Sequence, residues 1–383
     1  MNIYATPHPD LEDDVVIRDI HAMRAAMSSQ LRVPRRWTGT LRRTTQAKAI
    51  QGSNSIEGYD VTPQDAMAAV DDEPPLTADQ RTWAEILGYR RALTYVLRMA
   101  GDADFTLDSQ TIRSLHFMLL EHDFSKDPGR FRPGDVYVDA DEERVYVGPD
   151  PDLVPALVQT LVERLHAERD LDPLIRGAMA HLNLVMIHPF RDGNGRMARV
   201  LQTLTLARDT VLEPTFSSIE EWLGHNTQDY YRILALTGQG AWNPGNDATL
   251  WLKFTLRAHH MQAQTLRRRF AEADELWRRI DDLVAQHRLP ERTGDALFDA
   301  VQGIRLHRPG YVERAEVEDR TGTRDLARLT EVGLLDAVGK TRSRHYVAGP
   351  LLRAERAALD SGRAPLDDPY PWLQARLRSA TAG

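Results

Sequence analysis

Hydrophobic residues recur three and four positions apart along most of this sequence, the spacing of helices that bury one face. This pattern predicts helices over 44–56, 77–99, 107–122, 173–187 and 251–287, and one that begins near Asn194. The residues expected to face inward are Trp83, Ile86, Leu87, Ala92 and Tyr95 in the second helix and Met197, Val200, Leu201 and Leu204 in the last. The chain is therefore expected to be mainly α-helical.

Three residues mark where these helices should begin and end. Gly58 follows the 44–56 helix and can end it in a left-handed conformation. Asp172 can cap, and Pro173 can open, the 173–187 helix. Pro189 should end the same helix, because a residue that precedes proline is disfavoured in the helical region.

Two segments depart from helical spacing. Apolar and polar residues alternate over 136–139 and again over 144–147, on either side of an acidic turn, Asp141-Glu142-Glu143. This pattern predicts a β-hairpin. Residues 336–347 predict a second hairpin, which follows two short helices expected near 313–319 and 324–332. Two helices and then a hairpin is the element order of a winged helix-turn-helix.

Length and composition narrow the class of protein. A chain of 383 residues is too long for one ordinary core, so several domains are expected, with 289–294 as the linker candidate. The chain has no cysteine, which excludes disulfides and thiolate metal sites. It has no uninterrupted apolar run long enough for a membrane span and an acidic N-terminus without an apolar core, so a cytoplasmic protein is expected. The net charge of -8 argues against non-specific nucleic-acid binding by the whole surface.

The stretch HPFRDGNGRMAR, residues 188–199, carries the candidate chemistry. Gly193, Asn194 and Gly195 lie where a helix starts, so unpaired N–H groups and the helix dipole can bind phosphate there. Arg196 and Arg199 share one face of that helix and can bind further phosphate oxygens.

Two more residues of this stretch complete the candidate site. Asp192 precedes the glycines and is suited to a magnesium ion that bridges phosphates. His188, at the preceding helix end, is a base for neutral pH. Each residue alone has an ordinary structural interpretation, as a helix-end histidine, a turn or a solvated arginine, but together they converge on one helix start.

The stretch resembles the signature of the Fic family, His-x-Phe-x-(Asp/Glu)-Gly-Asn-Gly-Arg-x-x-Arg. Its specified positions are all matched, by His188, Phe190, Asp192, Gly193, Asn194, Gly195, Arg196 and Arg199. Fic proteins mostly transfer AMP from ATP to a hydroxyl group of a protein. The resemblance therefore implies a nucleotidyltransferase that uses ATP and Mg²⁺, built as a Fic-type helical bundle with a β-hairpin flap over the site.

The resemblance also implies a role for each residue. His188 would deprotonate the target hydroxyl, and Asp192 would hold Mg²⁺. The backbone from Gly193 to Gly195 and the Asn194 amide would cradle the phosphates. Arg196 would neutralise the departing pyrophosphate, and Arg199 would bind the γ-phosphate. Tyr230 and Tyr231, with Asn226 nearby, resemble the region around adenine, although adjacent helical tyrosines point apart and at most one should touch the base.

A second stretch, SNSIEG at 53–58, resembles the inhibitory motif of the same family. By that resemblance Glu57 pairs with Arg199 and keeps it from the γ-phosphate, and Ser53 adds a hydrogen bond. Without the first motif, Glu57 would be a surface carboxylate beside a helix cap. The implied domains are an N-terminal helical region 1–105 with an inhibitory helix at about 44–58, a Fic core 106–288, a winged helix 295–350 and a tail 351–383, loosely ordered from Gly362.

The 295–350 region leaves its partner open. It has nine basic and nine acidic residues, whereas a DNA-binding domain should be basic. Its second helix carries Arg324 and Arg328 but also Asp325 and Glu331, and basic residues recur in the wing at Lys340, Arg342 and Arg344. A role in protein docking or in presenting the target is at least as well supported as DNA binding.

The sequence thus favours an autoinhibited protein adenylyltransferase. Its partner would be a protein with an accessible hydroxyl, including this chain itself, and the resemblance is compatible with a homodimer. The alternatives are a Fic enzyme with another nucleotide donor or with AMP-removing activity, and a winged-helix regulator that uses nucleotide as a signal.

Overall fold

The computed structural model describes residues 1–140, 143–209, 212–340 and 344–379. Two compact units interleave along the chain. The first comprises Met1–Ser28, Gln46–Gln264 and Asp367–Gly383, and the second comprises Ser29–Thr45 and Thr265–Leu366. Three helices contribute to both: α1 (Leu11–Leu31), α2 (Thr38–Ile56) and α11 (Thr249–Gln286). The sequence-based domain ranges stay a prediction.

The first unit is built almost entirely from helices. Besides parts of α1, α2 and α11 it contains α3 (Pro63–Val70), α4 (Gln80–Met99), α5 (Ser109–Leu120), α6 (Val154–Ala167), α7 (Pro173–Ile187), α8 (Asn194–Asp209), α9 (Glu220–His225), α10 (Thr227–Gly238) and α16 (Pro371–Ser379). Single 3-10 turns occur at Phe124–Lys126, Pro151–Leu153 and Pro214–Phe216. The prediction of a mainly α-helical chain is confirmed. Within the described residues, no helix combines the length and the apolar character that a membrane crossing requires.

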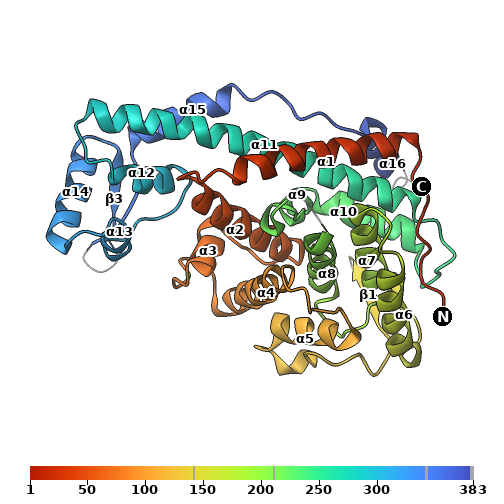
Figure 1. Cartoon of the computed structure of the whole chain (residues 1–383). Helices are drawn as coiled ribbons and strands as arrows, with labels where there is room; N and C mark the ends of the chain where they lie inside the picture. The colour runs from red at the N-terminus through yellow and green to blue at the C-terminus, as the bar shows by residue number, and fades with distance from the viewer. Residues whose placement is uncertain (141–142, 210–211, 341–343, 380–383) are drawn as a thin grey trace. The chain divides into compact units, whose positions relative to one another are not determined.

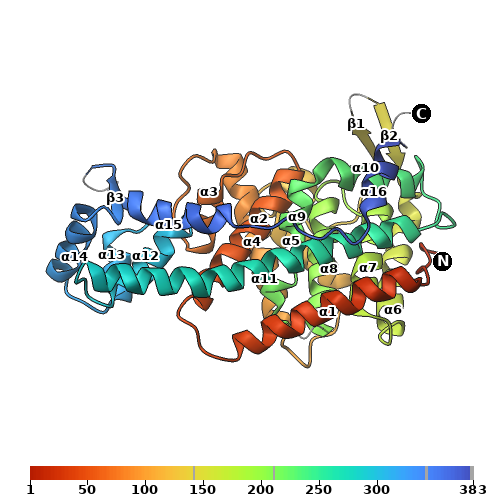
Figure 2. The same cartoon turned by 90° about the horizontal axis from the view of Figure 1, so that it is seen from above.

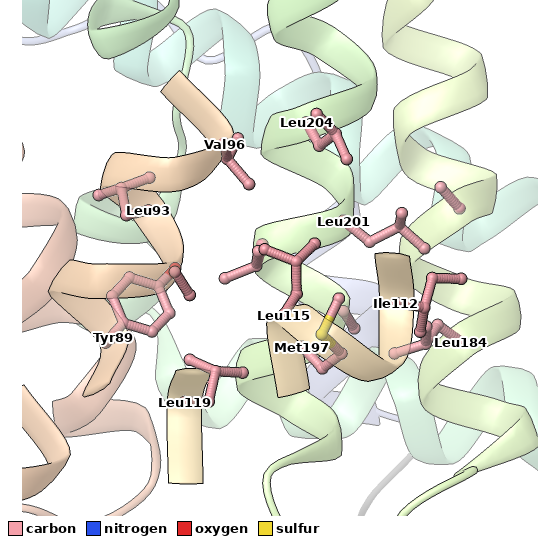
Figure 3. Packing of buried hydrophobic residues seen from close by; sticks show 14 of the residues in the cluster. Tyr89, Leu93, Val96, Ile112, Leu115, Leu119, Leu184, Met197, Leu201 and Leu204 are labelled. Atoms are coloured by element: carbon pink, nitrogen blue, oxygen red, sulfur yellow. The ribbon is translucent and has the colours of Figure 1, made fainter. Parts of the chain in front are cut away.

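Helix α8 is the centre of the first unit. It lies between α4 and α7 (Figure 1) and also packs against α5. Its predicted inward residues are all buried: Met197, Val200, Leu201 and Leu204. Figure 3 shows three of them, Met197, Leu201 and Leu204, among side chains of α4, α5 and α7. The helix that starts with the candidate phosphate site is therefore anchored in the core over its whole length.

The inward face of α4 differs from the expected one. The fully buried apolar residues are Ile86, Tyr89, Ala92, Leu93 and Val96, whereas Trp83, Leu87 and Tyr95 are only partly buried. The physical reason is that α4 packs against three helices, α3, α5 and α8, so apolar side chains also cover its flanks. A broad apolar arc does not show from spacing alone which residues are deepest.

The predicted first hairpin is present as β1 (Tyr137–Ala140) and β2 (Glu143–Val147). The strands are antiparallel, with Tyr137 opposite Val147 and a register irregularity after Val138. The predicted turn residues Asp141 and Glu142 lie outside the described residues. Figure 2 shows the hairpin projecting from the helices beside α10, and β2 contacts that helix.

The C-terminal tail is more ordered than expected. Helix α16 opens at Pro371, and Tyr370, Leu373 and Leu377 are fully buried in the first unit. Asp368 forms two hydrogen bonds of 2.8 Å with Arg257 of α11. The expectation of a loose tail from Gly362 is wrong for this part, because a proline at a first helical position starts a helix rather than breaking one.

The second unit contains α12 (Thr293–Val301), α13 (Arg308–Arg314), α14 (Asp319–Glu331), β3 (Leu335–Val338), β4 (His345–Ala348) and α15 (Pro350–Ser361). Strands β3 and β4 pair antiparallel, and Leu306 makes an antiparallel bridge to Tyr346. The two short helices begin about five residues before their predicted starts, because Pro309 opens the first and Glu316 has a left-handed φ of 51° between them. Arg342 lies outside the described residues.

Candidate active site

The loop between α7 and α8 begins with His188. This residue has φ of +50° and caps α7, as the following proline predicts, and its N–H donates to the Leu184 carbonyl at 3.0 Å. The ring Nδ1 lies 3.2 Å from the Val185 carbonyl oxygen. Because a carbonyl only accepts, Nδ1 carries the proton and Nε2 keeps a free lone pair. Burial lowers the pKa of His188 to about 4, so the ring is neutral at pH 7 and ready to accept a proton.

Buried side chains hold the rest of the loop in place. The Asn194 side chain accepts from the Phe190 N–H at 2.9 Å and donates to the Phe190 carbonyl at 2.8 Å. His116 stacks on the Phe190 ring with centroids 3.7 Å apart and contacts the Asp192 carbonyl through Nε2 at 2.9 Å. The Asn194 amide thus holds the loop, and its expected contact with the phosphates stays a prediction.

A carboxylate already lies against the predicted phosphate site. Gly193 has φ of +75°, and α8 starts at the next residue, as predicted. A Cβ atom placed on Gly195 would lie 2.6 Å from Oε1 of Glu57. The first turn of α8 therefore has an anionic neighbour, supplied by the chain itself, in the region where a phosphate is expected.

That carboxylate belongs to the predicted inhibitory stretch. Glu57 follows the last residue of α2, and its Oε1 accepts a hydrogen bond of 2.6 Å from Nη2 of Arg199. Ser53 accepts two more from the same guanidinium, at Oγ (2.8 Å) and at its carbonyl (3.0 Å). Arg199 is 1% exposed, and although burial lowers its pKa, the Glu57 charge raises it above the ordinary value. The predicted contacts of Glu57 and Ser53 with Arg199 are present.

The first signature arginine, Arg196, has a partner that the sequence did not reveal. Arg196 forms a buried ion pair with Glu85 of α4, and its guanidinium lies over the Tyr59 ring at 5.6 Å. Glu85 stands between residues of an inward helix face, and a lone carboxylate in such a position is a signal that could have found it.

Asp192 also has partners within the chain, Lys126 and the backbone of Gly193. Its Oδ2 lies 2.8 Å from Nζ of Lys126, and its Oδ1 accepts from the Gly193 N–H at 2.6 Å. Burial alone would raise the pKa of Asp192, but the Lys126 hydrogen bond and charge lower it. In the described part of the chain, no three histidine or acidic side chains gather closely enough to hold a metal ion alone. Asp192 can therefore supply one metal ligand, with nucleotide and water supplying the others.

Arg132 links this loop to the hairpin. Its side chain is 5% exposed and donates to three carbonyls: His188 (2.8 Å), Gly134 before β1 (2.7 Å) and Pro149 after β2 (2.5 Å). Its own N–H donates to the Pro189 carbonyl at 2.9 Å. One buried guanidinium thus joins the candidate base to both ends of the predicted flap.

Residues 106–206 match the Fic/DOC family. That segment contains the hairpin and the His188–Arg199 loop. Residues 106–206 form a Fic domain.

Two curated relatives named Protein adenylyltransferase Fic support this assignment. The protein of Drosophila yakuba is 32% identical over 166 residues, which are 42% of this chain and 30% of the relative. The protein of Nematostella vectensis is 28% identical over 205 residues, 51% of this chain and 44% of the relative. The chain thus spans less than half the length of either relative.

Solved structures show the same fold. A Fic family protein from Desulfovibrio desulfuricans G20 aligns over 90% of this chain and 98% of its own, with a TM-score of 0.56 and 21% identity. Fic-1 from C. elegans aligns over 69% of this chain and 73% of its own, with a TM-score of 0.53 and 22% identity. The first alignment extends well beyond the Fic domain.

The two tyrosines that follow the Fic domain lie differently from each other. Tyr230 is 1% exposed, and its hydroxyl contacts Nε2 of His181 at 2.8 Å, so its ring is closed to a ligand and its predicted nucleotide contact is not supported. Tyr231 is 48% exposed and donates to the Ile56 carbonyl at 2.9 Å. Asn226 donates to the Trp222 carbonyl at 2.8 Å. Of the three, Tyr231 remains the candidate for an adenine contact, and it also touches the end of the inhibitory helix.

Proposed function

We propose that this chain transfers AMP from ATP to a hydroxyl group of a protein and that Glu57 inhibits the transfer. The observation that carries the proposal is the Glu57 carboxylate, which contacts Arg199 and lies against Gly195 at the start of α8. A carboxylate in an anion site is in direct competition with a phosphate. The names of the curated relatives support AMP transfer as the reaction.

His188 would act as the base. Its neutral Nε2 takes the proton of the target hydroxyl while that oxygen attacks the α-phosphorus. The bond from this phosphorus to the bridging oxygen breaks, and pyrophosphate leaves with the electron pair. The N–H groups at the start of α8, with Arg196 and Arg199, stabilise the charge that moves onto the phosphate oxygens.

Asp192 is the residue we assign to Mg²⁺. The ion would neutralise phosphate charge in the bound nucleotide. Asp192 is suited to this because its carboxylate is ionised and 40% exposed. Lys126 contacts Oδ2 of Asp192, so the lysine and the ion would share this carboxylate.

Inhibition would follow from the use of Arg199. While Glu57 and Ser53 hold its guanidinium, Arg199 cannot bind a γ-phosphate, and the nucleotide loses one of its contacts. A contact worth about 1.4 kcal/mol is enough to shift such an equilibrium tenfold. The largely buried Arg199 end of this pair makes that size reasonable, since exposed pairs contribute less.

The test is a transfer assay with Mg²⁺ and α-labelled ATP. We expect label on protein with Glu57→Gly, little with wild type, and none with Glu57→Gly/His188→Ala. Glu168→Gly is the matched control, because Glu168 follows α6 as Glu57 follows α2. Equal labelling of wild type and Glu57→Gly would overturn the inhibitory assignment, and labelling that survives His188→Ala would overturn the base.

If no variant transfers label from ATP, the same proteins are assayed with other nucleoside triphosphates and with AMP-modified protein. The intact glycine and arginine positions of the motif favour a triphosphate donor. Release of AMP that depends on Glu57 would instead assign the carboxylate to the activation of water.

A second function is supported by one observation in α14. Asp325, one of the two acids that counted against DNA binding, is 4% exposed and bonds to Arg292 and Tyr311. The other, Glu331, is exposed and pairs with Arg328. The exposed arginines of α14 include Arg320 and Arg324, and neither has an ion-pair partner within the described part of the chain. The outer face of this helix is therefore more basic than the sequence count suggested, which supports a winged helix that binds DNA.

This second function is tested by gel shift with duplex DNA over a range of salt. We expect Arg320→Ala/Arg324→Ala to weaken binding and flatten its salt dependence. Arg278→Ala, an exposed arginine of α11 in the same unit, serves as the control. Identical shifts for all three proteins would leave protein docking as the role of this region.

A further inference from the structure

Glu85 is the most highly connected carboxylate of the site. It lies within α4, is 1% exposed, and pairs with Arg196 through Oε2. Its Oε1 accepts from the Tyr59 hydroxyl at 2.7 Å and from Lys126 at 3.0 Å, with Nε2 of His122 at 3.3 Å. A buried carboxylate with this many donors is fixed in position.

Glu85 differs from Glu57 in its position on a helix, in its exposure and in the number of cations it holds. Glu57 follows a helix end, its side chain is 22% exposed, and it holds one arginine. Glu85 stands inside a helix and holds two cations from different segments. Although burial alone would raise the pKa of Glu85, the Arg196 charge and the hydrogen bonds lower it to about 2, so it is ionised at any working pH. These differences favour movement of Glu57 away from its arginine and oppose movement of Glu85.

The two cations held by Glu85 also face Asp192. Lys126 spans the carboxylates, at 3.0 Å from Glu85 and 2.8 Å from Asp192. Arg196 bonds to Glu85 through Nη1, while its Nη2 lies 3.9 Å from Asp192 Oδ1. Each cation is therefore anchored on its protein side and directed toward the residue next to the anion site.

We propose that Glu85 is the positioning residue that holds Arg196 and Lys126 for the phosphates of the bound nucleotide. The inference rests on the proposed AMP transfer and adds two residues to it, Glu85 and Lys126. Its physical basis is preorganisation: a guanidinium that is already aimed at developing charge stabilises it without first having to reorganise. Glu85 itself makes no contact with substrate, and it acts through the two cations.

The decisive experiment is a double-mutant cycle on ATP affinity. The parent is Glu57→Gly/His188→Ala, which is expected to bind ATP without turnover. Arg196→Met is measured in this parent and again with Glu85→Gln present. We expect Arg196→Met to weaken binding about tenfold when Glu85 is intact and less than about threefold when it is not, because coupled residues are not additive. Equal losses in both backgrounds would overturn the proposal.

The outcomes separate this inference from the proposed function. If the parent does not bind ATP, the proposed function fails and the inference falls with it. If the parent binds ATP and the cycle is additive, only the positioning role of Glu85 fails. Lys126→Met, measured in the same cycle, is expected to show the same dependence on Glu85.

Transfer by Glu57→Gly gives the second readout. We expect Glu85→Gln to lower kcat about tenfold or more with a smaller change in ATP KM, and Glu85→Asp, which keeps the charge, to recover part of the rate. Asp13→Asn is the matched control, because buried Asp13 also holds a lysine and a tyrosine, Lys253 at 2.8 Å and Tyr370 at 2.6 Å. A rate increase with Glu85→Gln would make Glu85 an inhibitor, and equal losses with both variants would make its role structural.

Discussion

The carboxylate of Glu57 lies against the α-carbon of Gly195, so close that a Cβ there would stand 2.6 Å from Oε1. The absence of a side chain at Gly195 is thus a condition for the contact with Glu57. In the proposed function, the phosphates of the bound nucleotide would lie against the same backbone position. This shared position makes Gly195 a residue at which inhibition and binding can be separated by experiment.

Gly195→Ala should weaken ATP binding even when Glu57 is absent. The added methyl group occupies the space next to the helix N–H groups. It would meet only the ends of side chains, Oε1 of Glu57 at 2.6 Å and Nη1 of Arg199 at 3.3 Å, and Glu57 is absent from the background in which affinity is measured. We expect an unchanged melting temperature and an affinity at least about tenfold lower in the Glu57→Gly background. Calorimetric titration with ATP measures this, and an unchanged affinity would show that the phosphates bind elsewhere.

Ser53→Ala should activate transfer less than Glu57→Gly does. The substitution removes one of the three hydrogen bonds that Arg199 makes with Ser53 and Glu57 and keeps the carboxylate. A net loss of about 1 kcal/mol predicts a roughly fivefold rise in the transfer rate. Initial rates with α-labelled ATP test it, and Ser55→Ala, a serine outside these contacts, is the control. Activation equal to that of Glu57→Gly would mean that Ser53, and not the charge, carries the inhibition.

The rate of the activated enzyme should resist mild acid. Burial lowers the pKa of His188 to about 4 from an unfolded value of 6.5. The neutral base is therefore retained as pH falls through 6.5, and kcat of Glu57→Gly at saturating ATP should stay level from pH 7.5 to about pH 5.5. The same shift makes folding stability fall over that range, because only the unfolded chain takes up the proton between 6.5 and about 4.

A kcat profile with its midpoint near pH 6.5 would contradict this environment for His188. Thermal melts at each pH separate loss of the base from loss of the fold. Both kcat and folding stability fall in acid, but at different pH values. Both the rate and the melting temperature therefore have to be measured at each pH.

Arg132→Ala should loosen the hairpin and the His188 loop together. It leaves three carbonyls without their donor, those of His188, Gly134 and Pro149. A loss of about 2–4 kcal/mol in the free energy of unfolding is expected, with faster amide exchange in both segments. Urea denaturation and hydrogen exchange measure these effects. The control is Arg130→Ala, an exposed arginine two residues earlier, which should change neither the free energy of unfolding nor amide exchange. Faster exchange in only one of the two segments would show that Arg132 does not join the hairpin to the His188 loop.

The sequence predicted those features that depend on neighbours in the chain. The end of α2 at Gly58, the start of α7 at Pro173 and the loop from His188 to Arg199 are all local, so turn residues and helix spacing were sufficient. The contact between Glu57 and Arg199 is long-range, and only the resemblance to a known motif anticipated it.

The features that were missed depend on tertiary packing. Glu85 is 111 positions from Arg196, and Arg132 is 56 positions from the carbonyl it binds in His188. Single residues at such distances carry no local pattern. Tyr230 was misjudged for a related reason, because helix spacing does not show which of two adjacent tyrosines faces the core. Helix α16 was missed because a proline such as Pro371 is as typical of a loop as of the first turn of a helix.

The position of Glu57 just beyond α2 has a thermodynamic consequence. Three backbone hydrogen bonds close this terminal turn: Glu57 to Asn54, Gly58 to Ser55 and Tyr59 to Asn54, with the Tyr231 hydroxyl on Ile56. Fraying of that single turn would carry the carboxylate away from Arg199 while the rest of α2 stays helical. Helix ends fray at far lower free energy than the global unfolding of a domain. The resting enzyme would then have a small, steady leak of activity that rises on warming well below the melting temperature.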